Sequence, residues 1–357
     1  YLLNRLEFKL NSKNETGKIN ANNEFIENSL SKKYWSLTNR FSKYIFLGKQ
    51  LSEFNSLISY GVNNLKLQVS PGQFSEILNE GNPYSHVTQN VDSKDFNTSN
   101  SIGFTKGLGN FTLSPKIGFD FEQKIFNSNL AIDGNEKLNA DYKNEIDWKY
   151  NRIFANLGIQ FRYKNWRAGI DLPLNYRLYD VRKNNPNEKD ISFNKLNLEP
   201  SLYLIKDVNK FWQVSASTDI GKNYGNLNQI PNGYILRNYN TLVSNNSTFP
   251  KILSRNASVG FKYRNPLIAT FANASYTYSR NTTNITQSAT IDATTNTENS
   301  FIERKNSSDL NAVNANISKY FRYIKTKISL NASYTSENSQ LFVNNQFSKI
   351  KTTNKSI

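Results

Sequence analysis

The stretch IFANLGIQFRY at residues 153–163, followed by Lys164-Asn165 and by WRAGIDLPLNYRL at residues 166–178, decides the fold. Every second residue on each side of the Lys164-Asn165 pair is apolar, and the residues between them are mostly small or polar. Side chains alternate between the two faces of a β-strand, so one face of this segment is apolar and the other is hydrophilic. We therefore predict two antiparallel strands joined by a two-residue turn.

The same alternation recurs along the chain and predicts about 14 strands. The predicted strands cover residues 1–10, 34–47, 51–62, 95–106, 110–125, 145–163, 166–179, 191–205, 211–223, 252–263, 267–280, 309–321, 325–336 and 340–350. Pro115, Pro173 and Pro200 lie inside these strands, although proline cannot donate a ladder hydrogen bond. We interpret the three prolines as bulge or rim positions.

The composition is both polar and aromatic. Only 37% of the residues are hydrophobic and the mean hydropathy is -0.63, yet the chain holds 20 Tyr and 23 Phe. A face rich in Lys, Asp and Asn could not line a packed core, because buried unpaired polar groups are costly. Such a face can line a water-filled lumen. The sequence therefore predicts an all-β fold, an antiparallel transmembrane β-barrel in a bacterial outer membrane.

The predicted connections alternate in length. Short turns are expected near residues 47–50, 106–110, 164–165, 207–210, 264–266 and 322–325. Long polar loops are expected at residues 11–32, 65–96, 127–144, 180–189, 224–250 and 281–308. Outer-membrane barrels have short periplasmic turns and long extracellular loops. Trp35 and Trp148 precede or follow long loops, so we expect both in the outer aromatic girdle.

The side chains available for chemistry are few. The chain has no Cys and one histidine, His86, so a metal site built from His or Cys is excluded. No nucleophile motif surrounds His86, and we expect no catalytic residue, no enzyme activity and no cofactor. The run Asp133–Glu136 lacks the spacing of a calcium loop, which favours a solvated turn. The net charge of +16 is scattered along the chain; we expect contact with outer-membrane lipid and lipopolysaccharide and none with nucleic acid.

A family resemblance is carried by YGNLNQIPNGYILRNYNTL at residues 224–242. This segment resembles a loop of TonB-dependent receptor-like barrels of the Bacteroidetes, and the Asn-, Lys-, Tyr- and Phe-rich texture around it is similar to the flavobacterial type. The resemblance implies a plug domain followed by a barrel of about 22 strands. This chain departs from that pattern, since it shows neither a plug nor a TonB-contact segment, and its end at Asn354–Ile357 has no aromatic residue. We expect residues 1–357 to be the barrel portion of a longer protein.

The resemblance implies uptake of a solute across the outer membrane, with TonB as a partner through segments absent from this sequence. One alternative is a structural or secretion-complex barrel subunit, bound to a surface lipoprotein or to a larger membrane complex. Another is a 14-strand channel similar to the fatty-acid transporters, which takes the predicted strand count literally.

Two sets of residues are candidates for solute contact. In the 224–242 loop, aromatic rings and amides form an adaptable surface, unless the loop packs on its neighbours; these candidates are Tyr224, Tyr234, Arg237, Tyr239 and Asn240. Charged residues on the predicted lumen face are Lys116, Arg162, Arg167, Asp171 and Lys262. The lumen cations would favour anionic solutes, unless they pair with lumen carboxylates such as Asp120, Asp171, Glu199 and Asp219.

Overall fold

The computed structural model describes residues 2–21, 24–48, 50–136, 140–183, 190–225, 232–245, 248–291 and 296–357. One sheet of 21 strand segments dominates the molecule, which confirms the all-β prediction. The strands are β1 Leu2–Ala21, β2 Glu24–Leu47, β3 Gln50–Ser70, β4 Val87–Phe104, β5 Lys106–Leu108, β6 Phe111–Ile132, β7 Asn135–Glu136, β8 Lys143–Tyr163, β9 Trp166–Lys183, β10 Ile191–Leu198, β11 Ser201–Asp207, β12 Trp212–Asn223, β13 Asn232–Asn238, β14 Thr241–Asn245, β15 Ile252–Asn265, β16 Thr270–Thr283, β17 Thr286–Ile291, β18 Thr297–Ile302, β19 Asn306–Phe321, β20 Thr326–Val343 and β21 Gln346–Ser356. Helix α1 covers Ser75–Leu78 and the 3₁₀ turn η1 covers Ala140–Tyr142. Within the described ranges, no helix is long and apolar enough to cross a membrane.

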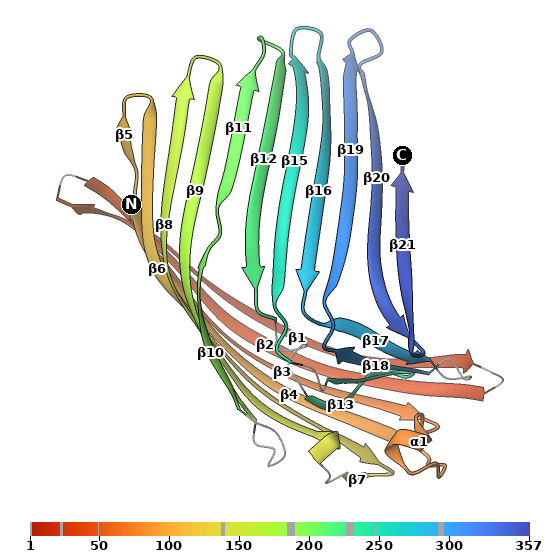
Figure 1. Cartoon of the computed structure of the whole chain (residues 1–357). Coiled ribbons are helices and arrows are strands. Elements are labelled where there is room, and N and C mark those ends of the chain that lie inside the picture. Colours follow the sequence, from red (N-terminus) through yellow and green to blue (C-terminus); the bar gives the residue numbers. More distant parts are fainter. Residues whose placement is uncertain are drawn as a thin grey trace.

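The main wall follows the order of the chain. Antiparallel pairing runs from β1 through β2, β3, β4, β6 and β8 to β9. Strands β10 and β11 both pair with β9, and the ladder continues through β12, β15, β16, β19 and β20 to β21. Figure 1 shows this wall curving strongly from the red hairpin to the blue one. No pairing among the described residues joins β1 to β21, so the closure and strand count of a complete barrel stay predictions.

The strand register confirms the predicted alternation of faces. Ile153 on β8 lies opposite Phe119 on β6 and Tyr176 on β9, and all three side chains are exposed. Exposed apolar side chains continue this surface around the wall and form what we term the apolar belt: Leu6, Phe8, Leu37, Ile58, Ile117, Leu157, Leu174, Leu196, Leu202, Trp212, Val259, Tyr276, Val313 and Leu330. A continuous apolar surface of this size matches a lipid-facing wall. The opposite face of the wall is the lumen face.

Short turns gather at one end of the wall, at the top of Figure 1. The Lys164-Asn165 turn between β8 and β9 is confirmed, with Lys164 in the left-handed region at φ 49°. Asn209 shapes the next turn, because its side-chain oxygen accepts hydrogen bonds from the backbone nitrogens of Phe211 and Trp212 at 2.9 and 3.0 Å. Asn side chains commonly stabilise turns in this way. Short connections therefore follow directly from local sequence.

Prolines occupy positions where the neighbouring strand is interrupted. Pro173 on β9 is beside the break between β10 and β11, and its carbonyl accepts a hydrogen bond from Glu199 N at 3.1 Å. Pro115 on β6 is opposite Leu157 on one side, and the gap between β4 and β5 lies on its other side. At both positions the regular pairing with one neighbouring strand is interrupted. Pro200 lies in the break between β10 and β11. These breaks support the interpretation of the three prolines as bulge or rim positions.

The prediction of long loops was wrong for most of the outer half of the wall, the half away from the short turns. Residues 11–21 and 24–32 of the predicted 11–32 loop are strands, since β1 and β2 pair from Leu2↔Lys43 to Ala21↔Glu24. The 65–96 connection shrinks to residues 71–86, because β3 continues to Ser70 and β4 begins at Val87. Beyond the membrane both faces of a strand contact water, so both carry polar residues and the alternation that reveals a strand disappears.

The C-terminal strand was also misplaced. Residues 340–350 are not one strand, because the chain reverses at Asn344 and Asn345, with φ values of 46° and 62°. Two consecutive residues with positive φ form the tight hairpin turn that matches the twist of antiparallel strands, and Asn tolerates this conformation. Phe342 and Phe347 face each other across the turn, with ring centroids 6.1 Å apart. The Asn-Asn pair was the signal that the sequence interpretation missed.

Candidate functional site

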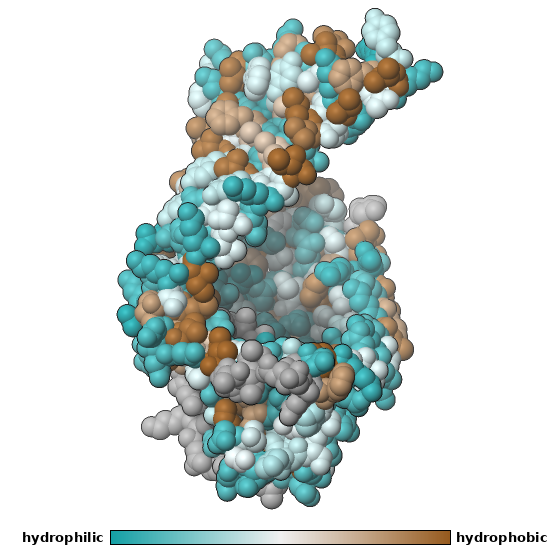
Figure 2. All heavy atoms as spheres, turned by 90° about the vertical axis from the view of Figure 1, so that its right-hand side faces the viewer, coloured by the Kyte–Doolittle hydropathy of each residue, from teal (hydrophilic) through white to brown (hydrophobic). Residues whose placement is uncertain are grey.

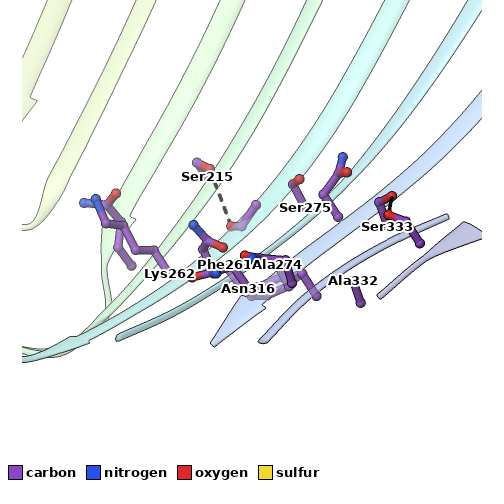
Figure 3. A pocket seen from close by; sticks show the side chains of 15 residues that line it. Ser215, Phe261, Lys262, Ala274, Ser275, Asn316, Ala332 and Ser333 are labelled. Carbon is purple, nitrogen blue, oxygen red and sulfur yellow. Dashed lines mark hydrogen bonds between the residues drawn. The ribbon is translucent and has the colours of Figure 1, made fainter. Parts of the chain in front are cut away.

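The lumen face encloses a recess whose inner surface is largely hydrophilic (Figure 2). A groove of about 450 Å³ crosses it from β12 to β21. The groove contains the polar side chains Gln213, Ser215, Lys262, Asn273, Ser275, Asn314, Asn316, Asn331, Ser333 and Ser356, which we term the amide groove. Figure 3 shows Ser215, Ser275 and Ser333 on β12, β16 and β20, with Lys262 toward one end.

Strand register places the larger side chains of the amide groove in one row. Gln213 lies opposite Lys262, and Lys262 lies opposite Asn273. Asn316 on β19 is opposite both Asn273 on β16 and Asn331 on β20. Amide side chains both donate and accept hydrogen bonds. The row therefore offers a polar, almost uncharged surface, which the sequence hid because each Asn is on a separate strand.

Arg162 and Arg167 line a second cavity of about 490 Å³ near the short-turn end, together with Thr112, Gln160 and Tyr203. The two arginines are direct register partners on β8 and β9. Both Asp207 oxygens accept from Arg167 Nη2 at 3.2 Å. Like charges directly opposite each other are unfavourable, and Asp207 offsets only one of them. The structure thus brings together two residues that the sequence singled out separately.

Lys116 and Asp171 line a third cavity on the lumen face, of about 370 Å³, with Glu53 and Asn156 nearby. Lys262 lies in the amide groove, so the five predicted lumen charges divide among three sites. They surround the recess and do not converge on one point.

The alternative was that these cations pair with Asp120, Asp171, Glu199 and Asp219, but no such ion pair occurs among the residues that the structure describes. Asp120 binds Arg152, and Glu199 binds Arg177 in a two-pronged pair with N–O distances of 2.5 and 2.9 Å. Asp219 accepts from Asn256 at 2.8 Å. The sequence interpretation missed Arg152 and Arg177, although both follow the parity of lumen-facing positions on their strands.

Four of the five predicted solute contacts in the 224–242 loop are partly or fully buried; residues 226–231 lie outside the described part of the chain. The Tyr224 hydroxyl donates to Asn197 Oδ1 at 2.9 Å, and the Tyr224 ring is buried. Tyr239 packs against a buried apolar cluster, and Asn240 is half-buried. Arg237 is exposed. Packing on neighbouring elements, the alternative weighed for this loop, describes most of it.

Tyr234 connects the same loop to two neighbours. Its ring stacks on Tyr142 of η1 with centroids 5.8 Å apart, and its hydroxyl donates to Glu298 Oε1 on β18 at 3.2 Å. Burial, together with the Glu298 carboxylate, raises the pKa of Tyr234 to about 12. Its hydroxyl therefore stays protonated at neutral pH and donates to Glu298.

Four strands outside the main wall form a structure that we term the outer bridge: β13, β14, β17 and β18. They lie at the end opposite the short turns (Figure 1). Strand β14 pairs in parallel with β18 over three residue pairs, Thr241↔Thr297 to Val243↔Asn299. Strand β17 pairs in parallel with β20 only through Ser288↔Phe342 and Ala289↔Val343. The bridge thus extends the sheet inward from β20.

The other end of the outer bridge packs on the lumen side of the wall. Leu236 and Leu242 are buried with wall residues and with the loop that carries α1. This cluster also contains Ile26, Leu67, Val69, Phe74, Leu78, Tyr84, Val87, Leu130 and Ile132. The Gly233 backbone nitrogen donates to Asn144 Oδ1 at 2.8 Å. The outer bridge therefore spans the recess from β20 to the wall of β3, β4 and β6.

Gln89 is the main polar anchor of the outer bridge on that wall. It is fully buried, its Oε1 accepts from Leu236 N at 2.8 Å, and its Nε2 donates to Asn129 O at 2.9 Å. Gln89→Leu should leave the barrel folded but speed amide hydrogen exchange in residues 232–245 about tenfold, because each unpaired buried group costs about 1–3 kcal/mol. Gln68→Leu, on β3 beside Thr88, is the matched control. Equal exchange in both variants would contradict the role assigned to Gln89.

Trp148 was wrongly expected in the outer aromatic girdle. It is only 4% exposed and faces the lumen side, where it stacks on Phe249 with centroids 5.7 Å apart. Tyr179 and Tyr224 pack into the same cluster. Trp35, by contrast, is exposed beside Tyr60, as a girdle residue should be. Trp148 and Ile153 are five residues apart on β8, so their side chains point to opposite faces of the strand. This signal was present in the sequence.

His86 lies beside a turn, where Asp133 Oδ1 accepts hydrogen bonds from the backbone nitrogens of Ser85 and His86 at 2.9 and 3.0 Å. The His86 ring nitrogen Nδ1 is 3.5 Å from the same oxygen. Asp133 thus holds the turn, as a solvated loop residue can. In the part of the chain that the structure describes, no group of three His, Cys, Asp or Glu side chains could hold a metal ion.

Comparison with solved structures shows which fold this is. The chain is similar to the alcaligin outer-membrane receptor FauA from Bordetella pertussis (10% identity, TM-score 0.51, covering 99% of this chain and 59% of that one). It is also similar to the outer-membrane transporter YddB from Escherichia coli (12%, 0.52, 95% and 46%) and to the ferric citrate transporter FecA (11%, 0.55, 88% and 43%). The fold is that of an outer-membrane β-barrel.

The chain spans about half the length of these solved chains, from 43% to 59%. No family model matches the sequence, and no curated protein matches it. The structural likeness therefore shows the fold alone.

Proposed function

We propose that this chain is the barrel of an outer-membrane solute transporter that resembles the TonB-dependent receptors. The observation that carries the proposal is a hydrophilic recess behind a lipid-facing wall, crossed at its outer end by a packed bridge. A purely structural barrel has no need for a recess lined with hydrogen-bonding groups. Solved structures similar to this chain include an alcaligin receptor and a ferric citrate transporter, which supports the same class of function.

The residues suggest a polar solute. The amide groove supplies donors and acceptors, and Arg162 and Lys262 add positive charge near the short-turn end. Cations that line a pore favour anions through the pore field. Arg237 and Asn240 on the outer bridge are the predicted loop residues best placed to meet a solute first, because Tyr224 is buried. In this proposal TonB acts through segments outside these residues, and the family is the flavobacterial type.

Energy-dependent uptake tests the proposal. A strain that lacks the gene should lose uptake of at least one polar solute from a labelled panel, and the full-length gene should restore it. Dissipating the proton-motive force should abolish the restored uptake. Uptake that persists without the proton-motive force would support a passive channel, and an unchanged solute profile with loss of a membrane complex would support a structural subunit.

A further inference from the structure

Three cations stand together on the lipid-facing side of the wall. Arg255 on β15 is the register partner of Arg280 on β16, and it is also opposite Ile220 on β12. Lys222 follows Ile220 on the same face of β12, two register pairs further from the short turns. All three side chains are exposed. We term Lys222, Arg255 and Arg280 the outer cation cluster.

The outer cation cluster sits at the edge of the apolar belt that is further from the short turns. Four register pairs from Arg255 and Arg280, toward the short turns, Val259 is opposite Tyr276, and both side chains are exposed. Ile220 and Val313 continue the same apolar surface on either side. Cationic side chains placed beside an apolar surface keep their stems on that surface and their charges at the level of lipid headgroups. The cluster therefore lies where headgroups meet the protein.

The protein neutralises little of this charge. Arg280 Nε is 3.7 Å from Asp309 Oδ1, an oxygen that also accepts from the Tyr278 hydroxyl at 2.7 Å. Lys222 and Arg255 make no ion pair within the described ranges. Directly opposed like charges destabilise a β-ladder. An anion between Arg255 and Arg280 would remove that repulsion, and guanidinium groups bind phosphate with paired hydrogen bonds.

We propose that the outer cation cluster binds the phosphates of lipopolysaccharide. The proposal rests on the outer-membrane placement in the proposed function, since the cluster lies at the end of the belt away from the short turns. A lipopolysaccharide headgroup carries more than one phosphate, which matches three cations on three strands better than a phospholipid with one phosphate does. The exposed Val259 and Tyr276 side chains below the cluster would contact the acyl chains.

The test uses the full-length protein purified in detergent and mixed with purified lipopolysaccharide. The triple variant Lys222→Gln/Arg255→Gln/Arg280→Gln should bind lipopolysaccharide at least tenfold more weakly than the unaltered protein. The matched control removes three exposed cations from the lumen face, in Arg40→Gln/Lys195→Gln/Lys327→Gln. The control should bind as the unaltered protein does. Heat-modified migration in gels verifies that each variant is folded.

Two further probes identify the ligand chemistry. Dephosphorylated lipopolysaccharide should bind the unaltered protein as weakly as intact lipopolysaccharide binds the triple variant. Phosphatidylglycerol vesicles should not compete. The proposal is overturned if the triple variant binds normally, if the lumen-face control loses as much binding, or if phosphatidylglycerol competes fully. Binding is measured without transport, so failure of this proposal and failure of the uptake proposal are distinguishable.

Discussion

Replacing Arg177 with methionine is expected to lower the free energy of unfolding by about 3–5 kcal/mol, the range for removing one partner of a buried ion pair. The Arg177 and Glu199 side chains are 8% and 14% exposed. Asn175 Nδ2 also donates to Glu199, at 3.1 Å, and the Lys222 backbone nitrogen does so at 3.3 Å. Without Arg177, the Glu199 carboxylate would keep only these weaker donors. Denaturant unfolding in detergent, followed by tryptophan fluorescence, measures the loss.

Arg5→Met is the control for that substitution. Arg5 pairs with Glu7 at 3.7 Å, but its side chain is 69% exposed. An exposed pair contributes about 0–1 kcal/mol, so this variant should unfold almost as the unaltered protein does. The double variant Arg177→Met/Glu199→Leu should recover part of the lost stability, because no charge is left unpaired. A loss below 1 kcal/mol in Arg177→Met would show that the pair is solvated.

Locking the outer bridge to the wall is expected to reduce uptake at least tenfold. The bridge joins β20 and the turn after it through two register pairs and two hydrogen bonds with Asn344, whereas its other end is held in an apolar cluster. The weaker joint, between β17 and β20, should open first. A solute can pass only when the recess opens. The chain has no cysteine, so Ala289→Cys/Val343→Cys would create a single disulfide at that joint. Uptake of the solute that the deletion strain fails to take up should fall when the disulfide is formed by oxidation and return when it is reduced.

The matched control for the locked bridge places the disulfide inside the wall. Ser217 and Ser258 are register partners on β12 and β15, and their hydroxyl oxygens are 2.8 Å apart. Ser217→Cys/Ser258→Cys joins strands that do not need to separate, so its oxidation should leave uptake unchanged. Mass spectrometry verifies each disulfide. Full uptake by the oxidised Ala289→Cys/Val343→Cys protein would show that solute passes without movement of this joint.

The sequence predicted the half of the fold that contacts lipid. The hairpin around Lys164-Asn165 could be predicted because a strand in contact with lipid has an apolar residue at every second position. The outer half of the strands was not predictable in this way, since residues 11–21 extend beyond the lipid and lose that periodicity. Trp148 was misplaced because its distance from a loop was weighed above its parity on β8.

The candidate site was predictable only in part. The lumen-facing direction of Arg162 and Arg167 follows from strand parity, but their position opposite each other depends on register. The amide groove and the outer bridge could not be predicted from the sequence either, because both depend on how strands pair. Gln213 on β12 lies opposite Lys262 on β15, and the Leu236 backbone nitrogen donates to Gln89 at 147 residues' separation. No local pattern records pairings between strands so far apart.

The length of the paired strands fixes how far the protein stands out from the cell. Strand β2 has 24 residues, which at about 3.3 Å per residue make about 80 Å of strand. Tilted by about 45°, it rises about 55 Å, and lipid covers only about 25 Å of that height. About 30 Å of hydrogen-bonded strand thus projects beyond the bilayer. Molecules outside the cell therefore meet paired strands before they reach the level of the lipid.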